Sequence, residues 1–173
     1  MRKKIILVGY MGSGKTIIAS RLASVLQKMH LDLDSLIENK ENLGVNSIFK
    51  TKGELYFRQL EHQVFKSLIE SDDEFILSLG GGTPCYANNH LFLKNEDVVS
   101  IYLKTSVEEL HKRLLDNKSS RPLIAAMEEV ELKEFISKHL FDRSYYYHQA
   151  KYIVSTDAKS IDAIVEEIKN LVA

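Results

Sequence analysis

Short apolar runs alternate along the chain with longer segments whose apolar residues recur every three or four positions. The first run, Ile5-Ile6-Leu7-Val8, is fully apolar and rich in β-branched residues. This pattern is typical of a strand that is buried on both faces, as in a parallel sheet. The same reasoning predicts four further strands, at residues 29–32, 75–79, 98–103 and 152–154.

Helical periodicity fills the segments between these runs. In residues 15–26 the apolar side chains that share one helix face are Ile18, Leu22, Val25 and Leu26. Further helices are predicted at residues 34–39 (capped near Asp34 or Ser35), 48–52, 54–70, 106–115 (capped by Ser106), 130–147 and 161–172. Because strands alternate with helices throughout, we expect one domain over residues 1–173, a three-layer α/β/α fold with a central five-stranded parallel sheet.

Composition narrows the class of protein without naming an activity. The 173 residues are 45% hydrophobic and 27% charged, which is typical of one globular domain. The formal net charge is −1 and no basic stripe is present, so we expect no nucleic-acid partner. The apolar run after the basic residues 1–4 stops at Gly9, too short for a signal peptide core or a membrane span. A single cysteine, Cys85, excludes an internal disulfide and favours a reducing cytoplasm.

The loop between the first strand and the first helix carries the clearest chemical signal. It reads Gly9-Tyr10-Met11-Gly12-Ser13-Gly14-Lys15-Thr16 and matches the phosphate-binding pattern G-x-x-x-x-G-K-[ST] in full. Its backbone N–H groups and the following helix N-terminus would surround the phosphates of ATP. Lys15 would reach the β- and γ-phosphates, and the Thr16 hydroxyl would serve Mg²⁺. With glycine at about 7% of residues, a chance match is on the order of one in a hundred or rarer.

Two carboxylates, Asp32 and Asp34, stand at the end of the second predicted strand. In an extended segment, residues two apart face the same side, so both would point into the crevice where parallel sheets bind ligands. Asp32 would then serve Mg²⁺ through water, and Asp34 would accept the proton of an attacking hydroxyl. The alternative is that Asp34 only caps the following helix.

Basic residues and glycines further along the chain suggest a grip on an anionic acceptor. Arg58 and Glu61 share a helix face and would pair, although a solvated surface ion pair is the alternative. The run Gly80-Gly81-Gly82 ends the third predicted strand and allows close backbone approach to a ligand, or forms a plain turn.

Two weaker signals concern arginines in the second half of the chain. Arg113 and Arg121 flank a polar stretch, which suits a basic loop that closes over a nucleotide or an ordinary surface loop. Arg143 with Tyr147, near the end of a long helix, has little meaning by itself.

Taken in order, these segments resemble the shikimate kinase family over about residues 4–172. The matching segments are Gly9 to Thr16, Asp32-Leu33-Asp34, Ile48-Phe49 with Gly53-Glu54, Phe57-Arg58 and Glu61, Gly80-Gly81-Gly82, Arg121-Pro122-Leu123, and Arg143 with Tyr147. The resemblance implies a P-loop, nucleoside monophosphate kinase-like fold, with substrate-binding helices at about residues 33–61 and a lid at about residues 112–124. It also implies a monomeric, Mg²⁺-dependent enzyme of aromatic amino-acid biosynthesis that transfers the γ-phosphoryl group of ATP to the 3-hydroxyl of shikimate.

The resemblance also implies roles for single residues. Lys15, Asp34 and Arg121 would be catalytic, and shikimate would be held by Asp34, Arg58, Gly80, Gly81, Gly82 and Arg143, with Glu61 orienting Arg58. ATP would be held by Gly12, Ser13, Gly14, Lys15, Thr16, Arg113 and Arg121. Thr16, and Asp32 through water, would serve Mg²⁺.

Two other functions fit the same phosphate loop. One is another small-molecule kinase of this fold, acting on gluconate or a nucleotide. The other is a regulatory or scaffold protein that binds a nucleotide without catalysis, although the presence of Lys15, Asp34, Arg58 and Arg121 argues against it.

Overall fold

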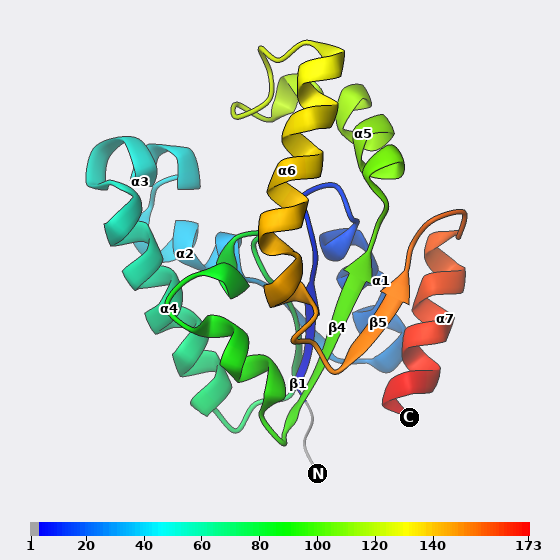
Figure 1. The fold of residues 1–173 in the computed structure, drawn as a ribbon. Helices are drawn as coiled ribbons and strands as arrows, with labels where there is room; N and C mark the ends of the chain where they lie inside the picture. The colour runs from blue at the N-terminus through cyan, green and yellow to red at the C-terminus, as the bar shows by residue number, and fades with distance from the viewer. Residues whose placement is uncertain (1–3) are drawn as a thin grey trace.

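The computed structural model describes residues 4–173, and of residue 120 the backbone only; the basic residues 1–3 lie outside this range. Five strands form one sheet in the order β2-β3-β1-β4-β5, and every neighbouring pair is parallel (Figure 1). The strands are β1 (Lys4–Val8), β2 (Met29–Asp32), β3 (Phe75–Ser78), β4 (Val98–Lys104) and β5 (Tyr152–Ser155). The predicted five-stranded parallel sheet is confirmed.

Helices connect the strands and lie on both faces of the sheet. They are α1 (Lys15–Leu26), α2 (Leu33–Glu41), α3 (Val45–Lys52), α4 (Glu54–Glu70), α5 (Val107–Asp116), α6 (Glu129–Tyr147) and α7 (Ile161–Val172). Three short 3₁₀ helices complete the chain: η1 (Thr83–Cys85), η2 (Asn89–Lys94) and η3 (Lys118–Ser120). Among the residues that the structure describes, no helix is long and apolar enough to cross a membrane.

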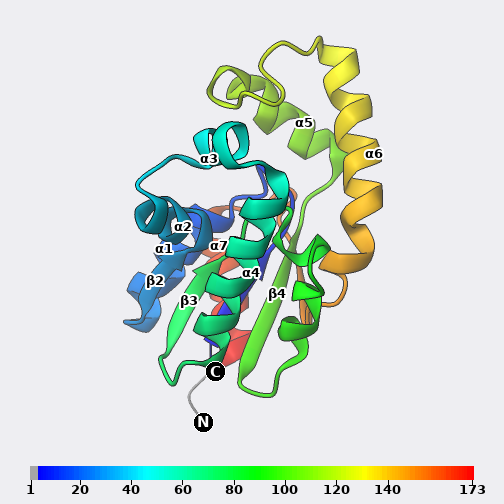
Figure 2. The same cartoon turned by 90° about the vertical axis from the view of Figure 1, so that its left-hand side faces the viewer.

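Alternation along the strands divides the core into two layers. In β1, Ile5 and Leu7 face α1 and α7, whereas Ile6 and Val8 face the layer that contains α2, α4 and α6. In Figure 2, α4 lies in front of the sheet and α7 behind it. Because β1 is in the middle of the sheet and packed on both faces, its four apolar residues are almost completely buried. This explains the fully apolar run of residues 5–8.

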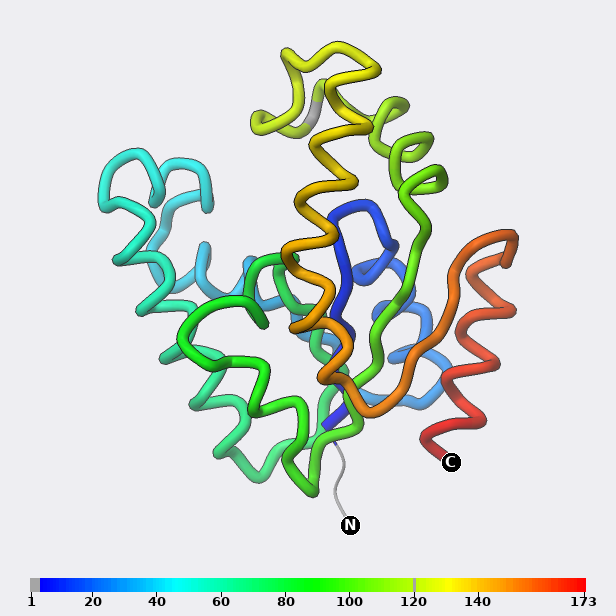
Figure 3. The backbone as a smooth tube through the Cα atoms, viewed as in Figure 1, coloured from blue at the N-terminus to red at the C-terminus, as the bar shows by residue number. Residues whose placement is uncertain are grey.

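The strand order determines where the ligand crevice forms. The loop after β1 lies between the ends of β3 and β4, the position at which parallel sheets of this type bind ligands. Figure 3 shows the α2–α3 segment on one side of this end of the sheet and the connection from α5 to α6 on the other. Segments from widely separated parts of the sequence therefore surround the phosphate loop.

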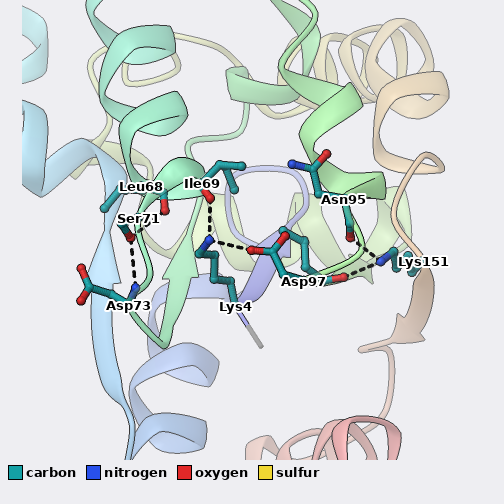
Figure 4. A network of polar contacts seen from close by, with 9 residues as sticks. Lys4, Leu68, Ile69, Ser71, Asp73, Asn95, Asp97 and Lys151 are labelled. Atoms are coloured by element: carbon teal, nitrogen blue, oxygen red, sulfur yellow. Dashed lines mark hydrogen bonds and ion pairs between the residues drawn. The ribbon is translucent and has the colours of Figure 1, made fainter. Parts of the chain in front are cut away.

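A separate polar network closes the opposite end of the sheet (Figure 4). The ammonium of Lys4, which is almost fully buried, donates to the backbone oxygen of Ile69 at 2.5 Å and to Asp97 Oδ2 at 2.7 Å. Lys151 donates to the backbone oxygens of Asn95 and Val98, each at 2.6 Å. These bonds join β1, the end of α4 and the turn before β4, and they lie away from the crevice.

Candidate functional site

The phosphate loop has the backbone form that anion binding requires. Gly14 has a φ of 91°, in the left-handed region, and stands as the N-cap of α1 without a side-chain cap. The N–H groups of the first helical turn therefore point toward the crevice, where the helix dipole also favours an anion. The Lys15 ammonium donates to the backbone oxygens of Gly9 at 2.8 Å and Tyr10 at 2.9 Å. Burial lowers the pKa of Lys15 to about 8, with a smaller opposing effect from Asp34.

The side chain of Ser13 is enclosed within the phosphate loop. Its side chain is buried, and its hydroxyl has no hydrogen-bond partner in the described part of the chain. Its backbone N–H donates to the backbone oxygen of Tyr10 at 3.1 Å. In this structure Ser13 therefore shapes the turn of the loop, and its side chain does not line the crevice.

A cavity of about 480 Å³ opens next to the phosphate loop, within the size range of small-molecule sites. Most of the predicted site residues line it: Gly12, Gly14, Lys15, Thr16, Asp32, Asp34, Gly80, Gly81, Arg113 and Arg121. They come from the loop after β1, from α1, from the end of β2 and the start of α2, from the loop after β3, and from α5 and the segment after it. The cavity therefore joins the predicted nucleotide residues to Asp34 and to two of the three glycines.

The two carboxylates reach the cavity by different routes from the one predicted. Asp32 is the last residue of β2 and the N-cap of α2, where its Oδ1 accepts a hydrogen bond from the N–H of Ser35 at 3.1 Å. Asp34 lies in the first turn of α2, so the expectation of one extended face is wrong. The alternative that Asp34 or Ser35 caps this helix is also wrong, because Asp32 does so. Asp34 lines the cavity because the helix begins at the crevice edge.

Burial and neighbouring charge change the proton affinity of Asp34. Desolvation raises its pKa from the ordinary 3.8 to about 6, and the carboxylates of Asp32 and Glu61 add to the effect. Lys15 opposes it. A carboxylate with such a pKa is ionised at neutral pH and is also basic enough to accept a proton in a reaction.

Oxygen donors suitable for Mg²⁺ occur at one edge of the cavity. The hydroxyl of Thr16 donates to Asp32 Oδ2 at 3.2 Å, so the two predicted metal residues are in contact. Residues 4–173 contain no cluster of three or more His, Cys, Asp and Glu side chains that could enclose a metal ion. One hydroxyl and one carboxylate fit Mg²⁺, which usually keeps several waters and binds substrate phosphates.

Arg58 and Glu61 form the predicted pair, within a larger arrangement. Arg58 Nη1 donates to Glu61 Oε1 at 2.9 Å, and the buried Glu61 accepts a second bond at Oε2 from the Thr83 hydroxyl at 2.8 Å. A Cβ on Gly82 would lie 2.9 Å from Arg58 Nη2, so a side chain at this position would displace the guanidinium from the glycine loop. The alternative of a solvated surface pair is wrong, because the Arg58 and Glu61 side chains are 15% and 1% exposed.

Arg143 stands beside the same glycine loop. A Cβ on Gly81 would lie 3.2 Å from Arg143 Nη1, and the hydroxyl of Tyr147 donates to the backbone oxygen of Gly81 at 2.6 Å. Neither Arg58, Gly82 nor Arg143 is part of the cavity lining itself. The two arginines therefore meet the glycine loop from α4 and α6.

Arg113 in α5 and Arg121 after it differ in their surroundings. Arg113 donates from Nη1 to the backbone oxygen of Gly12 at 3.2 Å and from Nε to Glu109 at 2.8 Å. The Nε of Arg121 is buried without a hydrogen-bond partner among the described residues, although the side chain lines the cavity. Arg113 is thus held against the phosphate loop, and Arg121 has donor capacity left for a ligand.

Sequence reasoning missed three residues at or next to the site. Asn117 lines the cavity, Thr83 bonds Glu61, and the ring of Tyr86 lies over the guanidinium of Arg58. For Asn117 the only available signal was its position between Arg113 and Arg121 in a polar stretch. Thr83 and Tyr86 follow the three glycines, but no spacing rule connects them to α4.

Comparison with known proteins agrees with the geometry. The sequence model of the family described as shikimate kinase matches residues 11–173. The shikimate kinase of Flavobacterium johnsoniae is 53% identical over 171 residues, covering 99% of each chain. The crystal structure of shikimate kinase from Bacteroides thetaiotaomicron superposes with a TM-score of 0.89 at 33% identity, covering 98% of each chain. Shikimate kinase from Acinetobacter baumannii, solved in complex with shikimate, gives 0.86 at 32% identity and covers 98% of this chain and 92% of the other.

Proposed function

The chain belongs to the shikimate kinase family, and we propose that its crevice transfers the γ-phosphoryl group of ATP to the 3-hydroxyl of shikimate through the residues described above. One observation carries the assignment of roles. Asp34 lines the same cavity as Lys15 and Arg121, while Arg58 and Arg143 converge on the adjoining glycine loop. This arrangement supports a base and phosphate-binding cations next to two arginines that suit a carboxylate-bearing alcohol.

The nucleotide side of the proposal rests on the phosphate loop. Backbone N–H groups of Gly12 and residues 14–16 surround the phosphates, and Lys15 and Arg121 stabilise the negative charge on the transferring group. Arg113, held against Gly12, lies against the base of the nucleotide. Binding of the phosphates replaces the backbone oxygens that the Lys15 ammonium now contacts.

The acceptor side uses Asp34 and the two arginines. The carboxylate of shikimate bonds to the guanidinium groups of Arg58 and Arg143 and to an N–H of the Gly80–Gly82 loop, and Glu61 keeps Arg58 in place. Asp34 accepts the proton of the 3-hydroxyl while the oxygen of that hydroxyl forms a bond to the γ-phosphorus. The bond from that phosphorus to the bridging oxygen breaks, and ADP leaves with the electron pair.

Mg²⁺ fits the edge of the cavity at which Thr16 and Asp32 meet, with Thr16 contributing its hydroxyl and Asp32 acting through water. When bound, the ion would neutralise charge on the β- and γ-phosphates.

Two subregions complete the proposal. Residues 33–61 form the acceptor-binding side, and residues 112–124 form a lid that excludes water. A monomer suffices for this scheme, because one chain supplies every residue that it uses. The compartment that we propose is the cytoplasm, which the single cysteine favours.

The test is ADP release by the purified protein with ATP, Mg²⁺ and one acceptor at a time. We expect turnover with shikimate and none above background with gluconate or a nucleoside monophosphate. Lys15→Ala is the control for ADP that arises from contaminating enzymes, and it should abolish the shikimate-dependent signal. Preference for gluconate or a nucleotide would contradict the acceptor assignment, and ATP binding without turnover on any acceptor would indicate a non-catalytic protein.

A further inference from the structure

The guanidinium of Arg58 contacts aromatic rings as well as two carboxylates, Glu61 at 2.9 Å and the more distant Glu54 at 3.7 Å. Tyr86 places its ring centroid 3.9 Å from the central carbon of this guanidinium. The corresponding distances to the rings of Phe57 and Phe49 are 5.3 and 5.8 Å. Cation–π attraction operates within about 6 Å and is strongest at close stacking, so Tyr86 makes the dominant aromatic contact.

The backbone around Tyr86 is fixed on both sides. Before it, the N–H of Cys85 donates to the backbone oxygen of Gly82 at 2.9 Å. After it, the N–H of Asn89 donates to the backbone oxygen of Tyr86 at 3.0 Å, and the fully buried Asn89 side chain donates to the backbone oxygen of Thr83 at 2.9 Å. The ring is therefore presented to Arg58 by a braced turn and not by a free loop.

The same turn also positions the carboxylate partner of Arg58. The Thr83 hydroxyl donates to Glu61 Oε2, and Glu61 Oε1 accepts from Arg58. One short segment after the glycine loop thus constrains the guanidinium twice, through a stacked ring and through the orientation of Glu61. The segment begins where the acceptor carboxylate is expected to bind. A displaced Tyr86 would therefore displace the Arg58 guanidinium that binds this carboxylate.

We propose that Tyr86 is a positioning residue for acceptor binding, which acts by holding the Arg58 guanidinium against the glycine loop. This inference rests on the proposed role of Arg58 in binding the shikimate carboxylate. Without the ring, the guanidinium would be free to rotate toward solvent. Acceptor binding would then have to fix its orientation, which would weaken the binding. The ring also shields the guanidinium from water, which strengthens its bond to an anion.

The exposure of Tyr86 makes the proposal testable, because the side chain is 37% exposed and its removal leaves no core cavity. We expect Tyr86→Leu to raise the KM for shikimate by about 3- to 10-fold, from the usual strength of a partly shielded cation–π contact. The KM for ATP and kcat should change by less than about twofold, because the phosphate loop is untouched. Tyr86→Phe keeps the aromatic face and should restore the wild-type KM for shikimate within about twofold.

Tyr152 supplies a matched control. It is 38% exposed, close to the exposure of Tyr86, but it lies in the edge strand β5, outside the acceptor-binding side and the lid. Tyr152→Leu should leave both KM values within about twofold of wild type. Circular dichroism melting of each variant would show whether the fold is intact.

A double variant shows whether Tyr86 acts through Arg58. If it does, Arg58→Ala with Tyr86→Leu should have the same KM for shikimate as Arg58→Ala alone, because the second change has nothing left to position. An unchanged KM in Tyr86→Leu, additive effects in the double variant, or a parallel rise in the KM for ATP would each overturn the role of Tyr86.

The outcomes also separate the two proposals. Absence of shikimate turnover by the wild type would overturn both. An unchanged KM for shikimate in Arg58→Ala would reject the role of Arg58 in binding the acceptor carboxylate. A raised KM in Arg58→Ala with no effect of Tyr86→Leu would reject only the positioning role.

Discussion

Replacing Asp34 by asparagine should inactivate the protein and at the same time stabilise it. The side chain is similar in size, but it carries no charge to desolvate. Burial and the neighbouring carboxylates raise the pKa of Asp34 from 3.8 to about 6, so the ionised form is unfavourable in the folded state. One pKa unit corresponds to about 1.4 kcal/mol, which sets an upper limit of about 3 kcal/mol on this cost at neutral pH. Because solvent reaches part of the side chain, we expect a gain of about 1–3 kcal/mol in the free energy of unfolding.

The pH dependence identifies the cause. The folded state binds the Asp34 proton more tightly than the unfolded state, so wild-type stability from this group falls as pH rises from about 4 to 6. Asparagine does not titrate. The stability difference between Asp34→Asn and wild type should therefore be largest above about pH 6 and should shrink toward pH 4, where the wild-type carboxyl is protonated.

Urea unfolding at pH 7 and pH 4.5 measures the free energy of unfolding, and thermal melting and kinetics at pH 7 complete the test of this prediction. For a chain of this length we expect a rise in Tm of about 2–10 °C at pH 7, with kcat lower by about 10²–10⁴-fold. Asp73→Asn, at an exposed carboxylate between α4 and β3, is the matched control and should change stability by less than about 0.5 kcal/mol. A variant that is destabilised, or stabilised equally at both pH values, would refute the electrostatic reasoning.

Three further predictions follow from the same contacts. Below about pH 6, kcat should fall about tenfold per pH unit as Asp34 becomes protonated, and Asp32→Asn should move the midpoint to lower pH, which a pH–rate profile would show. Glu61→Gln removes the carboxylate that orients Arg58 and should raise the KM for shikimate about 10-fold or more, with little change in the KM for ATP, as steady-state kinetics would show. Lys4→Met leaves the Ile69 carbonyl without its donor and should lower the free energy of unfolding by about 1–3 kcal/mol in urea titrations, with kinetics unchanged because the network lies away from the crevice.

The fold was predictable from local patterns where those patterns are strong. The predicted bounds of α1, α4 and α7 agree with the structure, because each helix has a clear apolar period. Helix α3 begins three residues before the predicted start, at Val45, which follows the N-cap Gly44 and packs against the core together with Ile48 and Phe49. The 3₁₀ helices η1 and η2 were not predicted at all, because such short turns have no period of their own.

The site was predictable where one segment of sequence contains the chemistry. The phosphate loop needs only a strand, a glycine pattern and a helix, so Lys15 and Thr16 could be assigned from spacing alone. Asp34 was assigned for a wrong geometric reason, because the extended strand ends at Asp32 and a helix follows. The contact between Tyr86 and Arg58 joins two elements that only the tertiary fold brings together, and no residue spacing indicates it.

Protonation states are a further property that residue identity does not give. Lysine and aspartate are ordinarily ionised over a wide pH range, yet burial in one cavity lowers the pKa of Lys15 to about 8 and raises that of Asp34 to about 6. In the free enzyme both groups are charged mainly between these values, a window that includes neutral pH. Bound triphosphate would favour the protonated lysine and raise its pKa, since a nearby opposite charge stabilises the ionised form. In a pH–rate profile, the alkaline decrease set by Lys15 should then appear in kcat/KM for ATP and should move to higher pH in kcat. The acid decrease set by Asp34 should appear in both profiles.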